Sequence, residues 1–342
     1  MESVYDTYQA IIGLEVHAQL LTKSKAYSSD VNEYGNQPNT NVSAITLGHP
    51  GTLPRPNKRH FQLAVKMGTA CSSQIHRETM FARKNYFYAD LPKGYQITQD
   101  KTPLCTGGHI MIKDADGNPK KIGLTRIHIE EDSGKSIHDI DPFNSLVDLN
   151  RAGVPLIEIV TDPDFRNAQE AYNYLTEVRK IVRYLDICDG NMEEGSLRCD
   201  ANISVMKKGA SEWGTKVEVK NMNSISNVKR AIEFEIKRQI DLLEAGGTVD
   251  PDTRGFEMST GTTISQRSKE AANDYRYFPE PDLPPVVLSQ TFIDDVLADM
   301  PPMHWELHEK FVNNYGLSDY DAEIIAGERD FALYFEELVT HT

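Results

Sequence analysis

The stretch AIIGLEVHAQL, residues 10–20, alternates apolar and polar side chains with the period of two that is typical of a β-strand. One face is aliphatic and carries Ile12, Leu14, Val16, Ala18 and Leu20. The other face is polar and carries Glu15, His17 and Gln19. We therefore expect a strand that buries its aliphatic face in a core and presents the polar face to solvent or to a ligand.

Three further stretches divide in the same way: LTRIHIEEDSGKS (124–136), SLRCDANISV (196–205) and TKVEVKN (215–221). Their polar faces carry Arg126, His128 and Glu130; Arg198, Asp200, Asn202 and Ser204; Lys216, Glu218 and Lys220. The adjacent residues Glu130 and Glu131 must point to opposite faces while the strand continues. Both can reach one ion only if the strand breaks there, which Asp132, Ser133 and Gly134 favour.

Two interpretations of these faces stay open. They can belong to an ordinary sheet with one wet side. The residue types favour a nucleotide site, because carboxylates hold a hard cation, the cation bridges phosphate oxygens, and Arg or Lys neutralises phosphoryl charge. We predict that Glu15, Asp200 and one of Glu130 and Glu131 hold a divalent ion. His17 is either a ligand, which favours Mn²⁺ over Mg²⁺, or a hydrogen-bond partner of the ligands.

Several other site classes are excluded by short motifs. The EEDSGKS segment is no phosphate-binding P-loop, because position 129 is isoleucine where that motif needs glycine. The four cysteines are scattered without a CxxC pair, so we expect buried thiols and no zinc. The formal charge of −15 argues against holding nucleic acid by bulk electrostatics. No signal peptide or run of about 18 apolar residues is visible, so we expect a soluble, cytoplasmic protein without a membrane partner.

The order of patterns along the chain predicts an α+β fold with a largely antiparallel sheet and flanking helices. Helices are expected after Asn57, after the capping pair Asn167 and Glu170, and over about 226–246. Asp116 and Gly117 predict a hairpin turn. Beyond Ser289 the periodicity becomes helical. We expect a catalytic domain over residues 1–290 and the incomplete beginning of an all-α domain over 291–342.

Eight longer motifs resemble one family. They are IGLEVHAQL (12–20), PNTNV (38–42), RKNYFYADLPKGYQITQ (83–99), IHIEEDSGKS (127–136), SLVDLNRAGVPLIEIV (145–160), MEEGSLRCDANISV (192–205), KVEVKNMNS (216–224) and DYRYFPEPDLPP (274–285). Together they resemble the B subunit of the tRNA-dependent amidotransferases (GatB), collinearly from about residue 8 to 290. The resemblance implies a fold similar to glutamine synthetase and a C-terminally truncated chain that lacks the tail domain.

The resemblance also implies a reaction. Such subunits use ATP with Mg²⁺ or Mn²⁺ to phosphorylate the side-chain carboxylate of Glu-tRNA(Gln) or Asp-tRNA(Asn), and ammonia then displaces the phosphate. An amidase subunit (A) supplies the ammonia and a small linker subunit (C) completes a heterotrimer. Two alternatives stay open: a non-catalytic tRNA clamp or scaffold, and a glutamine-synthetase-like ligase acting on a small free acid. The sequence leaves the acyl group and the tRNA undecided.

The family's site residues transfer to positions in this chain. Catalytic and metal-binding roles would fall on Glu15, His17, Glu130, Glu131 and Asp200. Nucleotide-binding roles would fall on Lys84, Asn85, Arg126, Lys135, Arg198, Lys216 and Lys220, with Glu193 and Glu194 as further lining. Asp274 and Arg276 would border the ammonia path. For Tyr86, Phe87 and Tyr88 we expect core packing. Some family members carry two cysteine pairs at the positions that this chain fills with Ser28, Ser29, Ser43 and Thr46, which again predicts no zinc.

Overall fold

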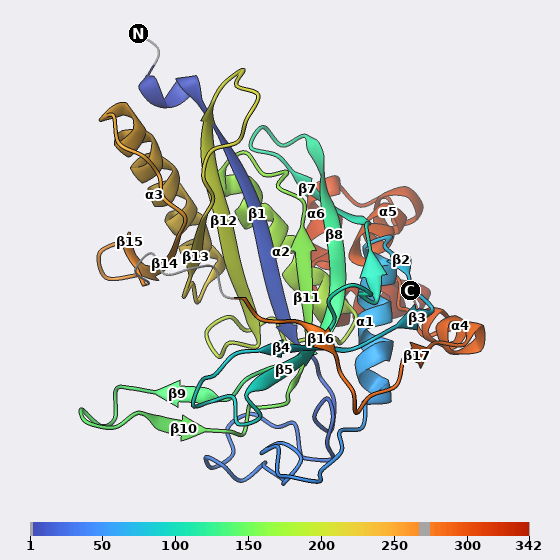
Figure 1. Cartoon of the computed structure of the whole chain (residues 1–342). Helices are drawn as coiled ribbons and strands as arrows, with labels where there is room; N and C mark the ends of the chain where they lie inside the picture. Colours follow the sequence, from blue (N-terminus) through green and yellow to red (C-terminus); the bar gives the residue numbers. More distant parts are fainter. Residues whose placement is uncertain (1–2, 267–273, 342) are drawn as a thin grey trace.

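The alternating stretch at residues 10–20 belongs to the central strand of a ten-stranded sheet in the computed structural model, which describes residues 3–266 and 274–341 (Figure 1). The strands of this sheet are β1 (Tyr8–Gln19), β2 (Gln74–Ile75), β6 (Cys105–Thr106), β7 (His109–Lys113), β8 (Pro119–Glu131), β11 (Pro155–Thr161), β12 (Leu197–Lys207), β13 (Val217–Lys220), β14 (Asp252–Glu257) and β15 (Thr262–Ser265). Their order is β15-β14-β13-β12-β1-β11-β8-β6-β2, and β7 also pairs with β8.

The sheet is largely antiparallel, as the sequence predicts. Among the described strands, β13 and β14 are the parallel pair, and the other neighbours run antiparallel. The predicted faces are confirmed: Ile12 and Val16 are fully buried on one side of β1, whereas Glu15 and His17 are partly exposed on the other. The hairpin predicted at Asp116 and Gly117 joins β7 to β8.

Three long helices cover the apolar face of the sheet: α1 (Lys58–Ala70), α2 (Ala168–Tyr184) and α3 (Ile225–Glu244). All three were predicted, and each begins after a side chain that accepts a backbone N–H bond, from Asn57, Asn167 and Ser224. The capping pair differs in one detail from its expected form. Glu170 accepts a hydrogen bond from the N–H of Arg166 at 2.7 Å, one residue before the cap.

Four further helices follow residue 289: α4 (Gln290–Ala298), α5 (His304–Tyr315), α6 (Asp319–Ala326) and α7 (Arg329–His341). The helical pattern predicted there is confirmed, and α5 ends at Gly316, whose φ is +69°. These helices pack against α1 and α2 and share their core, for example through Phe311. Lys66 on α1 donates to the carboxylate of Asp299 at 2.7 Å. Whether they begin a separate helical domain stays a prediction.

Three small sheets lie toward the lower end of the main sheet in the view of Figure 1, and a short 3₁₀ helix lies at its opposite, upper end. A 3₁₀ helix, η1 (Val4–Thr7), precedes β1, and three small sheets pair β3 (Glu78–Thr79) with β17 (Val286–Val287), β4 (Ala82–Asn85) with β5 (Tyr95–Thr98) and β16 (Phe278–Pro279), and β9 (Lys135–Ile137) with β10 (Leu146–Asp148). Within the described chain, no helix has both the length and the apolar character that a membrane span requires. The four cysteines are buried free thiols, as expected.

Strand β8 ends after Glu131, and Gly134 explains how the chain turns there. A Cβ on this glycine would lie 2.9 Å from the carbonyl oxygens of both Asp148 and Asp90. We expect Gly134→Ala to lower the free energy of unfolding by about 1–3 kcal/mol, measured by urea denaturation, because two backbone segments must shift. Gly13→Ala is the matched control, since its methyl would meet no atom closer than 3.7 Å. Equal losses in both variants would contradict the crowding argument.

A buried histidine on α1 makes stability depend on pH. The Nε2–H of His60 donates to the carbonyl of Leu156 at 2.8 Å, and the side chain is 1% exposed. Burial lowers the pKa of His60 from 6.5 to about 4. Between these two pKa values the unfolded chain binds a proton at His60 that the folded chain does not bind. The free energy of unfolding therefore decreases as the pH falls from 6.5 through 4.

We expect this pH-dependent loss to be about 3 kcal/mol larger for the wild type than for His60→Gln, which keeps a donor but does not titrate. The check is urea denaturation of both proteins at pH 7, 5.5 and 4.5. Parallel pH profiles would show that His60 is protonated in the folded state without cost.

Candidate active site

A cleft of about 1430 Å³ opens over the polar face of the central strands. Its floor is formed by side chains of β1, β8, β11, β12 and β13, and one wall by residues 84–88 and 274–278. Pockets for single small ligands are roughly 300–1,000 Å³. The cleft therefore has room for more than one small substrate.

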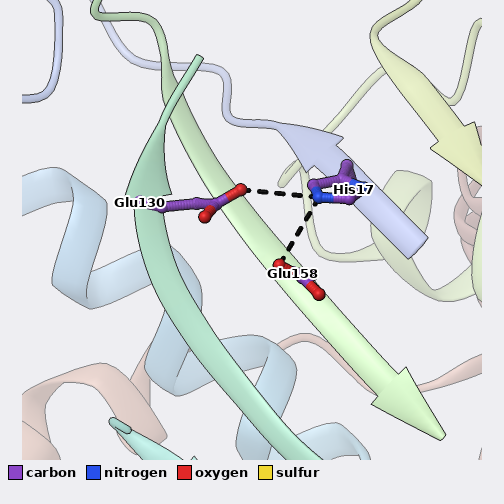
Figure 2. A group of neighbouring side chains, drawn as sticks. All are labelled: His17, Glu130 and Glu158. Atoms are coloured by element: carbon purple, nitrogen blue, oxygen red, sulfur yellow. Dashed lines mark ion pairs between the residues drawn. The ribbon is translucent and has the colours of Figure 1, made fainter. Parts of the chain in front are cut away.

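The first group of side chains on this floor is His17, Glu130 and Glu158, shown in Figure 2. His17 on β1 pairs in register with Glu158 on β11, which pairs with His128 on β8. The Nε2 atom of His17 lies 3.5 Å from a carboxylate oxygen of Glu130 and 3.5 Å from one of Glu158. Behind them, His128 Nε2 lies 3.2 Å from Glu158 and 3.6 Å from Glu130. Its ring thus holds the two carboxylates together.

The electrostatics of this group follow from burial and from the two acids. Burial disfavours protonated imidazole, yet Glu158 and Glu130 raise the pKa of His17, and they raise that of His128 to about 9. The reverse holds for the acids. Burial favours the neutral carboxyl, but the histidines hold the pKa of Glu158 well below its usual range and also lower that of Glu130. The group therefore keeps two negative charges in a nearly buried place.

The second group is Glu15, Asp200 and Glu218, from β1, β12 and β13. Glu15 faces Asp200 directly in the strand register, and Asn202 donates to Glu15 at 2.9 Å. Burial and then the neighbouring carboxylates raise the pKa of Glu15. Lys220 partly compensates, because its ammonium lies 2.6 Å from Asp200 and 3.0 Å from Glu218.

Both groups fit divalent cations. In each, one ligand atom per residue lies within 4.8 Å of the others. The Glu15, Asp200 and Glu218 group offers oxygen alone, the donor set that suits Mg²⁺. The His17, Glu130 and Glu158 group adds a nitrogen, which Mn²⁺ accepts more readily. The structure thus separates residues that were expected to share one ion: Glu15 and Asp200 lie in one group and Glu130 in the other.

Cationic side chains surround the acids in the cleft. Arg198 forms a two-pronged pair with Asp132, with N–O distances of 2.7 and 3.0 Å. Lys84 lies 4.8 Å from the ring centre of Tyr275. Burial lowers the pKa of Lys84, but Glu130 and other groups raise it to a value above the ordinary one. Lys84 therefore stays positively charged close to the first group.

Comparisons with known proteins agree with this arrangement. The sequence model of the family described as "GatB/GatE catalytic domain" matches residues 10–294. The chain belongs to this family. Proteins named as the B subunit of aspartyl/glutamyl-tRNA(Asn/Gln) amidotransferase are 51% identical in Alkalilimnicola ehrlichii, 50% in Pseudomonas syringae pv. syringae and 52% in Thermodesulfovibrio yellowstonii. The matches cover 97–98% of this chain and 69–70% of those proteins.

The GatB/GatE fold brings most of the predicted residues into one cleft. Its lining includes Glu15, His17, Lys84, Asn85, Glu130, Arg198, Asp200, Lys220, Asp274 and Arg276. Asn85 also fixes the 274–277 segment, since its side-chain amide donates to the carbonyls of Tyr275 and Arg276 at 3.1 and 2.9 Å.

Other predicted residues are not brought there. The described lining of the cleft does not include Glu131, Arg126, Lys135, Lys216, Glu193 or Glu194. Glu131 lies on the opposite face because β8 continues to that residue, and it pairs there with Lys93 and accepts the N–H of Ile97 at 2.9 Å. Arg126 contacts the carbonyl of Asp100 at 3.4 Å, and Lys135 is exposed in the β9–β10 hairpin.

The expected core packing of Tyr86, Phe87 and Tyr88 is wrong. Phe87 is 88% exposed and Tyr88 is 56% exposed, and all three residues line the cleft. They sit in the connection between β4 and β5, where no periodicity fixes the direction of a side chain.

Asp132 and Glu158 were given no site role from the sequence, and His128 and Glu218 were placed on the polar strand faces without being assigned as ligands. A signal existed for Glu158, which is the only charged residue in the stretch PLIEIVT, 155–161. A carboxylate in an otherwise apolar, buried strand needs a partner. For Glu218 the signal was its alternation with Val217 and Val219.

Proposed function

We propose that this chain acts as the B subunit of an aspartyl/glutamyl-tRNA(Asn/Gln) amidotransferase and phosphorylates the side-chain carboxylate of a misacylated tRNA with ATP. The observation that carries the proposal is the pair of three-residue groups on the cleft floor, together with the cationic side chains of Lys84, Arg198 and Lys220 in the same cleft. The names of the relatives, at 50–52% identity, supply the substrate class.

The chain's own residues suit each part of this reaction. The residues of the two groups would hold Mg²⁺ or Mn²⁺, which would offset the acidic charge and supply positive charge for binding ATP. Lys84 and Lys220 bring fixed positive charge to the place where phosphoryl charge develops. The two hydrogen bonds to Asp132 fix the guanidinium of Arg198 before a substrate binds. Arg198 is therefore preorganised to orient a phosphate or carboxylate.

The carboxylate needs this activation because hydroxide is a poor leaving group. Attack of the side-chain oxygen on the γ-phosphorus of ATP forms an acyl phosphate and releases ADP. Ammonia then displaces phosphate and leaves the amide. We propose that an amidase subunit (A) supplies the ammonia, that a small subunit (C) links the two chains, and that the sheet corresponds to the catalytic fold of glutamine synthetase.

The test uses the chain assembled with its partner subunits and γ-labelled ATP. We expect ATP turnover and amide formation only with Glu-tRNA(Gln) or Asp-tRNA(Asn), and loss of both in Asp200→Asn, with tRNA binding unchanged. Turnover with free glutamate or aspartate and no tRNA would favour a ligase acting on small acids. Unaltered turnover in Asp200→Asn would favour a non-catalytic clamp.

A further inference from the structure

The wall of the cleft carries an aromatic rim, which we define as Tyr86, Phe87 and Tyr88. Its central residue, Phe87, is 88% exposed although it lines the cleft. A phenylalanine exposed to that extent gains nothing from burial in the free protein. Adjacent exposed aromatic rings that line a cleft are candidate contacts for a ligand, unlike a single exposed ring elsewhere on the surface.

The rim is held in place by its neighbours. Tyr86 makes edge-to-face contacts with Tyr88 and Tyr275, with ring centres 5.9 and 6.1 Å apart. The backbone N–H groups of Tyr86 and Leu91 donate to the carbonyls of Gly94 and Tyr88 at 3.3 and 3.0 Å. The connection between β4 and β5 is therefore a closed turn that fixes the aromatic side chains at the mouth of the cleft.

The absence of a side chain at Gly94 leaves room for the ring of Phe87. This glycine has a φ of +74°, and a Cβ built on it would lie 3.0 Å from the Phe87 ring. One face of the ring thus rests on bare backbone. The high exposure of Phe87 means that the remainder of the ring is open to a planar partner in the cleft.

The charge of the chain indicates what kind of contact is needed there. With a formal charge of −15, the chain repels a polyanion, and bulk electrostatics cannot hold an RNA end over an acidic floor. Stacking of a base on an aromatic ring does not depend on charge and is tolerant of sequence. Among the cations near the rim, Lys84 lies two residues before Tyr86, next to the first carboxylate group.

We propose that Phe87, flanked by Tyr86 and Tyr88, is the stacking platform for the unpaired 3′-terminal nucleobase of the aminoacyl-tRNA. This inference rests on the proposed function, which supplies the RNA substrate. The adenine base of ATP is the alternative partner for the same stacking contact with Phe87. Phe87 and Tyr88 line the cleft yet are largely exposed to solvent, as contact with the end of a large substrate requires, whereas the groups that suit phosphates lie on the floor.

The test is steady-state kinetics of the complex assembled with its partner subunits, for wild type, Phe87→Ala and Phe87→Trp. Loss of one base stack corresponds to about a 5- to 150-fold weaker interaction. We expect Phe87→Ala to raise KM for the aminoacyl-tRNA by a factor in this range, and Phe87→Trp to restore it. KM for ATP should stay within about twofold, and the salt dependence of KM for the tRNA should keep its slope, because no phosphate contact is removed.

Phe143→Ala is the matched control. Phe143 is 92% exposed, lies in the β9–β10 hairpin and does not line the cleft. The Phe143→Ala variant loses the same kind of side chain from an equally exposed position, so we expect its KM values to equal those of the wild type. An effect of similar size in both variants would show that general surface changes cause it, and would overturn the proposal.

A binding cycle makes the result independent of catalysis. Uncharged tRNA with and without its 3′-terminal nucleotide is titrated into wild type and Phe87→Ala. We expect removal of the nucleotide to weaken binding to the wild type and to have no further effect on the variant. Equal losses in both proteins, or a rise in KM for ATP in place of tRNA, would overturn the proposal while the proposed function stands. Absence of tRNA-dependent turnover in the wild type would overturn both the proposed function and the stacking proposal.

Discussion

Replacing Glu158 by glutamine is expected to reduce tRNA-dependent ATP turnover by about 100-fold or more while leaving the fold intact. Glu158 lies between two histidines, 3.5 Å from His17 and 3.2 Å from His128, and it carries one of the two negative charges of the first group. Glutamine has the same shape but no charge, so it would weaken the hold on a cation and remove the negative charge of a carboxylate that both imidazoles contact.

The measurement pairs turnover of the assembled complex with calorimetric titration of Mg²⁺ or Mn²⁺ into the protein. Glu193→Gln is the control, because this residue was expected in the site but is exposed on a turn outside the described cleft lining. We expect its turnover and metal affinity to match the wild type. If Glu158→Gln binds metal and turns over normally, the first group is a structural hydrogen-bond network and not part of the catalytic site.

Replacing Asp132 by asparagine is expected to lower the free energy of unfolding by about 3 kcal/mol. The Asp132 side chain is 5% exposed and accepts two hydrogen bonds from Arg198 and one from Gln19, the last at 2.8 Å. Arg151 approaches the same carboxylate at 3.7 Å. Asparagine would remove the carboxylate charge that both guanidinium groups approach.

Chemical denaturation of both proteins measures this loss. The control is Asp186→Asn, which also removes a carboxylate partner of an arginine, Arg329, but from a side chain that is 68% exposed. Exposed pairs contribute about 0–1 kcal/mol, so a small effect is expected there. Adding Arg198→Met to Asp132→Asn should recover part of the stability, because it removes the unpaired charge. A loss below about 1 kcal/mol in the single variant would mean that water reaches Arg198 freely.

The sequence predicted the floor of the site where the backbone period alone decides the direction of a side chain. In β1, β12 and β13 the alternation placed Glu15, Asp200 and Glu218 on one face, and the structure has them there. The two-residue alternation of side chains does not predict which strands pair in the sheet. That Glu158 reaches His17 follows from the pairing of β11 with β1, strands separated by more than 130 residues of chain, and this pairing is set by the packing of the whole domain.

Loops were predicted least well, for a related reason. In Tyr86, Phe87 and Tyr88 three aromatic residues in succession suggested a core, since burial of such side chains is strongly favourable. The turn between β4 and β5 instead holds them outward through backbone hydrogen bonds that no pattern of side chains reveals. Similarly, the choice between Glu130 and Glu131 depended on where β8 stops, and ends of strands are set by contacts such as those around Gly134.

Glu15 and His17 stand two positions apart on β1 and serve different groups. In an extended chain this step measures about 6.6–6.8 Å and hardly stretches. Insertion or deletion of a single codon between or before them would move one or both into the core and carry an apolar residue to the floor. During evolution this strand can therefore accept substitutions far more easily than insertions or deletions.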